Sequence, residues 1–194
     1  MRATEFILTE VIMYPPTSTA GTGVAEWAYS DCLAKKAKEL SPLNVGLKNQ
    51  VFEFPDHIKI IVFDEDNTPI SYLALAPFND GFKVSTVATE PAASGKGIAV
   101  KIYAAASSYF NKPIYSDSTQ TDASRLGIWK KLWSQYPERL VGYDQKTKQD
   151  LQLGYGKDNM PIANQTQPIY SPTNGKDVTS RSRTRLLKLL PTVG

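Results

Sequence analysis

Short runs of β-branched and aromatic residues, separated by polar turns, fill the first half of the chain. They lie at residues 5–14, 58–63, 70–76 and 82–88. Runs of this length, bounded by proline, asparagine, aspartate and glycine, are typical of strands. The connections between the last three runs are short, at residues 64–69 and 79–81, so we expect these three strands to form an antiparallel meander.

Apolar residues at helical spacing predict three helices, at residues 25–40, from residue 98 onward, and at residues 121–136. The first helix would pack on the sheet through the face that carries Tyr29, Leu33, Ala37 and Leu40. Further short strands are expected near residues 113–116, 140–143 and 151–153. The predicted fold class is therefore mixed α/β (α+β), with a mainly antiparallel sheet flanked by helices.

Composition changes beyond Gly154, because glycine, proline and small polar residues dominate through Ser180. This indicates a linker or an extended arm. Residues 181–190 alternate basic residues with leucines, which predicts a short amphipathic helix that binds a partner protein. We therefore expect one domain at residues 1–153 and a polar arm at residues 154–194 with a basic, leucine-rich end.

The chain has 194 residues, of which 41% are hydrophobic and 21% charged, and this composition is that of one ordinary globular domain with an extension. Its net charge of +3 is concentrated at the end, where residues 176–194 carry five basic side chains and one acidic side chain. The body is therefore not expected to bind nucleic acid. The basic end could make a salt-dependent contact with nucleic acid, or it could be a disordered, solubilising tail.

The apolar segment at residues 2–14 is interrupted by Glu5 and Glu10, and no small-residue cleavage site follows it. We therefore expect neither a signal peptide nor a membrane span. Cys32 is the only cysteine and His57 the only histidine, which argues against an internal disulfide and a metal site of the usual Cys/His kind. These features favour a cytoplasmic protein with metal-free chemistry.

Candidate chemistry comes from the segment at residues 87–99, where a predicted strand turns through Gly95 and Gly97 into a predicted helix. The first amides of a helix bind anions, and glycines allow a diphosphate to approach closely. Lys96 adds a positive charge. The spacing is not that of a Walker A loop, and Val100 replaces the third glycine of a dinucleotide fingerprint. A tight turn without a ligand is the alternative interpretation.

In this context the chain resembles the GNAT (GCN5-related N-acetyltransferase) superfamily over roughly residues 5–153. The order of predicted elements is similar, and so is the loop, since the family's Gln/Arg-x-x-Gly-x-Gly/Ala pattern is met at Gly95 and Gly97. Ala92 stands where the family has Gln or Arg. Residues 116–121, with Ala123, Trp129, Lys131 and Leu132 after them, are similar to GNAT-like proteins of tailed bacteriophages.

The resemblance implies that the chain binds acetyl-CoA and transfers its acetyl group to a primary amine of a small molecule or a protein. The diphosphate of the coenzyme would contact the loop and helix start, formed by Ser94, Gly95, Lys96, Gly97, Ile98 and Ala99. The pantetheine and thioester would contact the backbone of Val87, Ala88 and Thr89. No nucleophilic side chain is required, so Cys32 is interpreted as a packing residue.

The acid and base of the reaction are less clearly indicated. Many relatives use a tyrosine on the last helix as the acid, and Trp129 stands at the corresponding place here. Tyr103, Tyr109 and Tyr115 could replace it, although each is more often a packing residue. For the base, Asp80, Glu90 and Asp117 lie at strand ends, although Asp80 is typical of its Asn-Asp-Gly turn; the main candidates are Glu90, Asp117 and Tyr103. Because of these departures, the alternative is a catalytically degenerate GNAT-like protein of a bacteriophage, acting in the virion or on a host factor in the host cytoplasm.

Overall fold

The structure is a computed structural model that describes residues 23–117, 125–155, 161–163, 167–168 and 185–192. The predicted strand at residues 5–14 lies outside the described residues, and so does the start of the predicted helix at residues 121–136. Within the described part, no helix has both the length and the apolar character needed to cross a lipid bilayer.

The first half of the main sheet is an antiparallel meander of five strands. They are β1 (Lys38–Leu40), β2 (Asn49–Glu53), β3 (Ile58–Phe63), β4 (Pro69–Phe78) and β5 (Gly81–Thr89). The three runs that the sequence analysis assigned to a meander are therefore β3, β4 and β5. The strands β1 and β2 come from a segment without a clear apolar pattern.

The second half of the sheet brings together segments that are distant in sequence. It contains β6 (Ile114–Tyr115), β12 (Arg185–Leu189), β7 (Leu140–Asp144) and β8 (Gln149–Leu151), in this spatial order beyond β5. Every neighbouring pair of the nine strands is antiparallel except β5 and β6. A separate three-stranded sheet holds β9 (Leu153–Tyr155), β10 (Pro161–Ala163) and β11 (Gln167–Pro168). The predicted fold class is confirmed.

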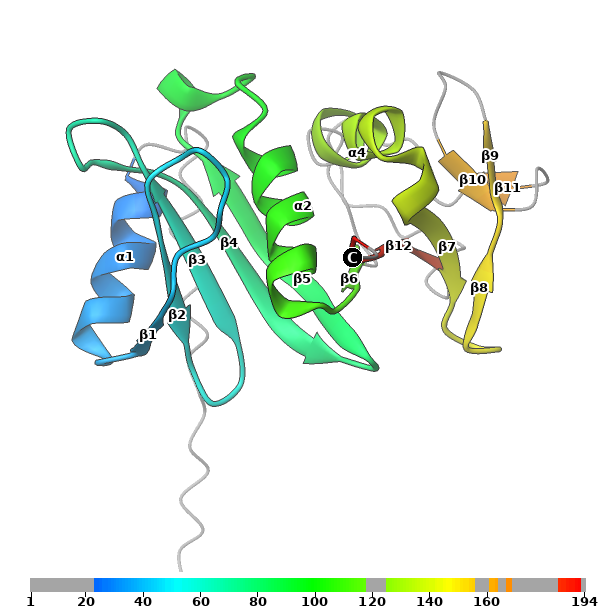
Figure 1. The fold of residues 1–194 in the computed structure, drawn as a ribbon, viewed down its shortest axis with the longest axis horizontal. Coiled ribbons are helices and arrows are strands. Elements are labelled where there is room, and N and C mark those ends of the chain that lie inside the picture. Colours follow the sequence, from blue (N-terminus) through cyan, green and yellow to red (C-terminus); the bar gives the residue numbers. More distant parts are fainter. Residues whose placement is uncertain (1–22, 118–124, 156–160, 164–166, 169–184, 193–194) are drawn as a thin grey trace, which may run out of the picture.

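Helices cover both faces of the main sheet (Figure 1). Strand β3 is buried on both faces, and its residues alternate between two hydrophobic clusters. Ile60 and Val62 belong to the larger cluster, together with residues of α2 (Ile98–Phe110) and α4 (Lys130–Gln135). Ile61 and Phe63 face α1 (Val24–Ala34) on the other side.

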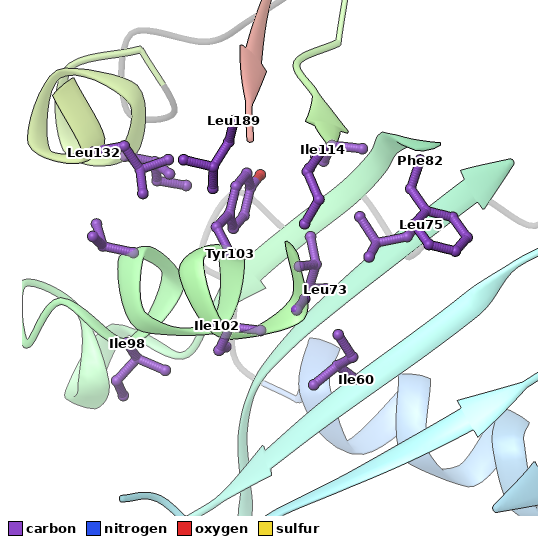
Figure 2. Close-up of a cluster of buried hydrophobic side chains, with 14 of the residues drawn as sticks. Ile60, Leu73, Leu75, Phe82, Ile98, Ile102, Tyr103, Ile114, Leu132 and Leu189 are labelled. Atoms are coloured by element: carbon purple, nitrogen blue, oxygen red, sulfur yellow. The ribbon is translucent and has the colours of Figure 1, made fainter. Parts of the chain in front are cut away.

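The larger cluster lies where α2 crosses β4 and β5 (Figure 2). It also contains Ile128 and Trp129 from η2 (Arg125–Trp129), a π-helical turn that runs directly into α4. Leu187 and Leu189 of β12 join this cluster from the far end of the chain. The core therefore includes both halves of the sheet.

The first predicted helix is shorter than expected. It ends at Ala34, and residues 38–40 form strand β1. Its buried positions are Val24, Ala25, Ala28 and Cys32, whereas Leu33 is 55% exposed. The predicted face is right at Tyr29, which packs on Phe52 and Phe63 of the sheet, and wrong at Leu33. Small residues allow the helix to approach the sheet closely, and this contact outweighs the spacing of the larger apolar side chains.

The prediction of an amphipathic helix at residues 181–190 is wrong, because residues 185–189 are strand β12. Leu186, Leu187, Lys188 and Leu189 are all buried. Successive side chains of a strand point to opposite faces of the sheet, so both faces are covered here, which would not be so for a surface helix. The predicted linker also contains strands β10 and β11. The domain boundary at residue 153 stays a prediction.

Candidate functional site

The candidate site lies where the parallel strands β5 and β6 diverge. They pair only at Phe82 with Ile114 and at Lys83 with Tyr115, and the Phe82 amide donates to the Pro113 carbonyl at 2.9 Å. Beyond Tyr115 the chain turns to β12, where the Ser116 amide donates to the Leu187 carbonyl at 2.8 Å. From residue 84 to residue 89, β5 therefore pairs with β4 on one edge and with no described strand on the other (Figure 1). We call this edge the open edge.

A β-bulge marks the point of divergence. Ala74 of β4 pairs with Thr86 and Leu75 pairs with Val84, so Ser85 is the extra residue of β5. Its hydroxyl donates to the Ala74 carbonyl at 3.1 Å. A bulge bends its strand and increases the local twist, which gives a physical reason for β5 to leave β6 at this position.

Hydrogen bonds on the β4 side identify the backbone groups that face the open edge. The Glu90 amide donates to the Ile70 carbonyl at 2.8 Å, and the Ala88 carbonyl accepts from the Ser71 hydroxyl at 2.8 Å. Backbone groups alternate in direction along a strand. The amides and carbonyls of Val87 and Thr89 therefore point to the open edge, whereas those of Ala88 point to β4.

The glycine loop follows the open edge directly and leads into α2. Gly95 and Gly97 have φ angles of +79° and +74°, and a Cβ atom added to either would meet nothing within 4 Å. Gly97 is the N-cap of α2, and no side chain caps this helix. The first amides of a helix have no acceptor within it, so the start of α2 offers donors beside open space.

Ser94 was expected to contact the diphosphate, but its amide is already used within the loop. The Ser94 amide donates to the Pro91 carbonyl at 3.1 Å and closes the 3₁₀ turn η1 (Pro91–Ala93). Within the described part of the chain, the amides of Gly95, Lys96 and Gly97 make no such bond. The amides at the start of α2 therefore stay available from residue 95 onward, whereas the Ser94 amide supports the turn before them.

Glu90 lies at the start of α1. Its two carboxylate oxygens each accept a bond of 3.0 Å, one from the Gly23 amide and the other from the Ala25 amide. A carboxylate at a helix N-terminus satisfies free amides and interacts favourably with the helix dipole. This contact ties α1 to the end of β5.

Tyr103 lies inside the core. It is completely buried, and its ring meets that of Trp129 edge to face at a centroid distance of 5.5 Å. In Figure 2 it projects from α2 toward Leu189 and Leu132. Trp129, which stands in the place of the expected catalytic tyrosine, is buried with it. Both rings therefore contribute packing between α2 and η2.

Asp117 is the candidate that lies beside the divergence. It follows β6 by two residues, and its carboxylate lies 3.5 Å from the ammonium group of Lys83 on β5. The Asp117 side chain is 41% exposed, so a ligand between the strands could reach it. Cys32 lies elsewhere, on the face of α1 that packs on the sheet. Burial raises the pKa of its thiol to about 11, in agreement with a packing role.

The opposite end of the β5–β6 pair carries a polar cluster that the sequence analysis missed. We call it the Lys188 cluster. The Lys188 ammonium lies 3.0 Å from Asp150 and 3.6 Å from Asp80, and it sits over the rings of Tyr115 and Tyr143 at 5.4 and 5.5 Å. The Tyr115 hydroxyl donates to Asp80. These residues are so far apart in sequence that no local pattern indicates their contact.

The Lys188 cluster pairs one ammonium group with two carboxylates. Burial favours a raised pKa for Asp80, but the hydrogen bond from Tyr115 and the charge of Lys188 outweigh it and hold the pKa below its usual value. Burial and the neighbouring Asp80 carboxylate raise the pKa of Tyr115. Tyr115 therefore stays protonated and acts as a hydrogen-bond donor.

Comparison with known proteins gives a limited likeness. No protein-family model matches the chain, and no curated protein does. A structure assigned to the GNAT family of acetyltransferases, from Bacteroides thetaiotaomicron, aligns with a TM-score of 0.38 and 12% identity over 73% of this chain. The chain spans 65% of that structure's length, which is less than two thirds of it.

A second solved structure is a chimera of spermidine N-acetyltransferase from Vibrio cholerae with hSSAT. It aligns with a TM-score of 0.35 and 15% identity, over 84% of this chain and 74% of its own. Because both TM-scores are below 0.5 and both identities are very low, neither structure assigns a substrate or an activity to this chain.

Proposed function

We propose that the chain is an acetyl-CoA-dependent N-acetyltransferase that acts on a primary amine. One observation carries the proposal: the parallel strands β5 and β6 part after two paired residues, and the open edge of β5 leads into an uncapped helix start. A strand edge with free amides and carbonyls can bind an extended, amide-containing chain such as pantetheine. A helix start behind left-handed glycines suits a diphosphate.

The residues present fit such a coenzyme. Val87 and Thr89 would bind its pantetheine amides, and the amides of residues 95–99 would hold its diphosphate, because no Cβ atom of Gly95 or Gly97 occupies the approach. The coenzyme supplies an acetyl group activated as a thioester. The chain supplies position, and a backbone amide at the open edge would stabilise negative charge on the carbonyl oxygen.

We assign Asp117 as the general base that takes a proton from the amine. The amine nitrogen forms a bond to the carbonyl carbon, the carbon–sulfur bond breaks, and the thiolate leaves with the electron pair. Asp117, directly or through one water, accepts the proton that the amine nitrogen loses. Glu90 is held by α1 and Tyr103 is buried in the core, so Asp117 has the better access to an acceptor.

Calorimetric titration with acetyl-CoA tests the coenzyme site. Gly97→Val introduces a side chain into the space before α2, and we expect it to weaken binding at least about tenfold. Gly46→Val is the matched control, because Gly46 has a φ of +65°, is equally unobstructed and lies outside the loop. No binding by the unaltered chain at millimolar acetyl-CoA would contradict the proposal.

Release of free thiol across a panel of primary amines tests catalysis. We expect Asp117→Asn to lower kcat by about 10²-fold or more while the KM for acetyl-CoA stays unchanged. Lys83→Met removes the ammonium group beside Asp117 but keeps the carboxylate. It therefore separates the effect of the ion pair from the effect of the base. Binding of acetyl-CoA without thiol release from any amine would favour the alternative, a degenerate protein that keeps the coenzyme site.

A further inference from the structure

A second cavity lies on the outer surface of α2, on the side of the helix away from the sheet. We call it the α2 groove. Its volume is about 670 Å³, enough for a mononucleotide-sized ligand. It is formed by the loop at residues 44–46, by one face of α2, and by Tyr136 and Arg139 after α4. Ala104 and Ala105 lie among its lining residues, and no acidic side chain of the described residues does.

Arg139 gives the groove a positive charge that forms no ion pair among the described residues, although the neighbouring Glu138 carboxylate favours its charged form through space. Its Nε donates to the Leu190 carbonyl at 2.9 Å, and its Nη2 donates to the Ala104 carbonyl at 3.2 Å. All of its hydrogen-bond acceptors in the described part are neutral, and no described carboxylate lies within 4.0 Å as an ion-pair partner. Burial also lowers the pKa of this guanidinium. A partly buried cation without a counter-ion is unusual.

Lys101 adds a second charge at the edge of the same groove. It is exposed on the face of α2 that carries Ala104 and Ala105, and it has no ion-pair partner among the described residues. Two cations that line one cavity and face no carboxylate attract an anion. Arginine and lysine together are the usual donors to a phosphoryl group.

Two aromatic residues, Tyr109 and Tyr136, also line the groove. Tyr109, at 40% exposed, is one of two large hydrophobic residues that the described part leaves exposed. It lies eight residues beyond Lys101 on the same helix, which corresponds to about 12 Å. The guanidinium of Arg139 lies over the ring of Tyr136, 5.3 Å from the ring centroid. An exposed ring that lines the same cavity as the two cations is suited to stack on a base.

We propose that the α2 groove binds a nucleotide, with its phosphoryl group on Lys101 and Arg139 and its base on Tyr109. The cavity at the Lys188 cluster does not offer the same chemistry, because Asp80 and Asp150 line it and pair with Lys188. The α2 groove is separate from the coenzyme loop and would be a second ligand site. The proposal therefore goes beyond the acetyltransferase function and does not depend on it.

Calorimetric titration of the full chain with AMP, ribose 5-phosphate and adenosine tests this site. We expect AMP to bind about tenfold more tightly than either fragment, since both the phosphoryl group and the base contribute. Adenosine binding as tightly as AMP would overturn the role of the cations. Ribose 5-phosphate binding as tightly as AMP would overturn the role of Tyr109, and no AMP binding at millimolar concentration would overturn the site.

Exposed positions provide variants that leave the fold intact. Lys101→Glu is expected to weaken AMP binding about tenfold or more, and Tyr109→Ser about fivefold. Lys131→Glu is the matched control, because Lys131 is exposed on α4 and does not line the groove. Equal losses in Lys101→Glu and Lys131→Glu would show only a general charge effect and would overturn the proposal.

Gly97→Val separates this site from the coenzyme site. We expect the variant to bind AMP as the unaltered chain does, even where it loses acetyl-CoA. If AMP binding is lost together with acetyl-CoA binding, the nucleotide lies on the glycine loop and the α2 groove is not its site. If acetyl-CoA binds neither the unaltered chain nor any variant but AMP binds as expected, the proposed function fails and the proposal of a nucleotide site in the α2 groove still holds.

Discussion

The two ends of strand β5 belong to the same sheet but differ in what lies along their outer edge. At residues 82 and 83 the strand is paired with β6 on one edge and β4 on the other, and the Lys188 cluster ties this end to β12, β7 and β8. At residues 84–89 the β4 pairing continues, and no described strand lies on the other edge.

Under the proposed function, one strand would serve both stability and binding. At the closed end, hydrogen bonds and ion pairs hold distant segments together. At the open end, the backbone donors and acceptors of Val87 and Thr89 face no described strand. The bulge at Ser85 separates the two regions, because it redirects the strand without breaking its bonds to β4.

Gly81→Ala is expected to damage the closed end most. An added Cβ atom would lie 2.1 Å from the Pro113 carbonyl oxygen, and this contact with backbone leaves little room to relax. The free energy of unfolding should fall by about 3 kcal/mol or more, measured by urea denaturation. Gly127→Ala is the control, because its Cβ atom would meet nothing within 4 Å. An equally small effect of both substitutions would show that this end is loosely packed.

A pair of proline substitutions compares neighbouring residues of the open end. Ala88→Pro removes an amide that points to β4, and we expect it to cost about 3 kcal/mol of stability. Val87→Pro removes an amide that points to the open edge, so it should cost at least about 2 kcal/mol less. It should also weaken acetyl-CoA binding about tenfold. Denaturation and calorimetry measure the two effects, and equal stabilities of the two variants would contradict the assigned directions.

Lys188→Met tests the charge that joins the closed end to the C-terminal strand. Methionine keeps most of the buried volume but removes the contacts with Asp80, Asp150 and the two tyrosine rings. We expect a loss of about 1 to 2 kcal/mol in the free energy of unfolding. Lys148→Met changes an exposed lysine of the same cavity and should change stability little. A loss as large in the control would indicate a nonspecific effect of net charge.

The smallest expected effect is a pH dependence of the closed end. Because the pKa of Asp80 is held below its usual value in the folded state, its ionised form stabilises the fold at neutral pH. This contribution should be lost as pH falls below about 4, the ordinary pKa of an aspartate. Asp80 is exposed enough to limit the effect to under about 1 kcal/mol, or about 2 to 4 °C in Tm. The difference in Tm between the unaltered chain and Asp80→Asn should shrink from pH 6 to pH 3.5.

Local patterns predicted the elements whose signals lie within a few residues of one another. Strands β3, β4 and β5 match the apolar runs at residues 58–63, 70–76 and 82–88 within two residues at each end. Gly95 and Gly97 indicated the turn into α2, and both adopt the left-handed conformation that glycine favours. The amides of residues 95–99 could be predicted in this way because a helix start has the same free donors in any protein.

Contacts between distant segments decided the remainder. Leu186, Leu187 and Leu189 suit a surface helix or a buried strand, and only the gap between β6 and β7 selects the strand. The bulge at Ser85 depends on the register with β4, and the Lys188 cluster depends on residues 80, 115, 150 and 188 meeting in space. The sequence by itself determined where β5 ends and α2 begins, because backbone conformation is set locally. Only the tertiary structure decided that most of β5 would have an open edge, because strand pairing is set by which segments remain to fill the sheet.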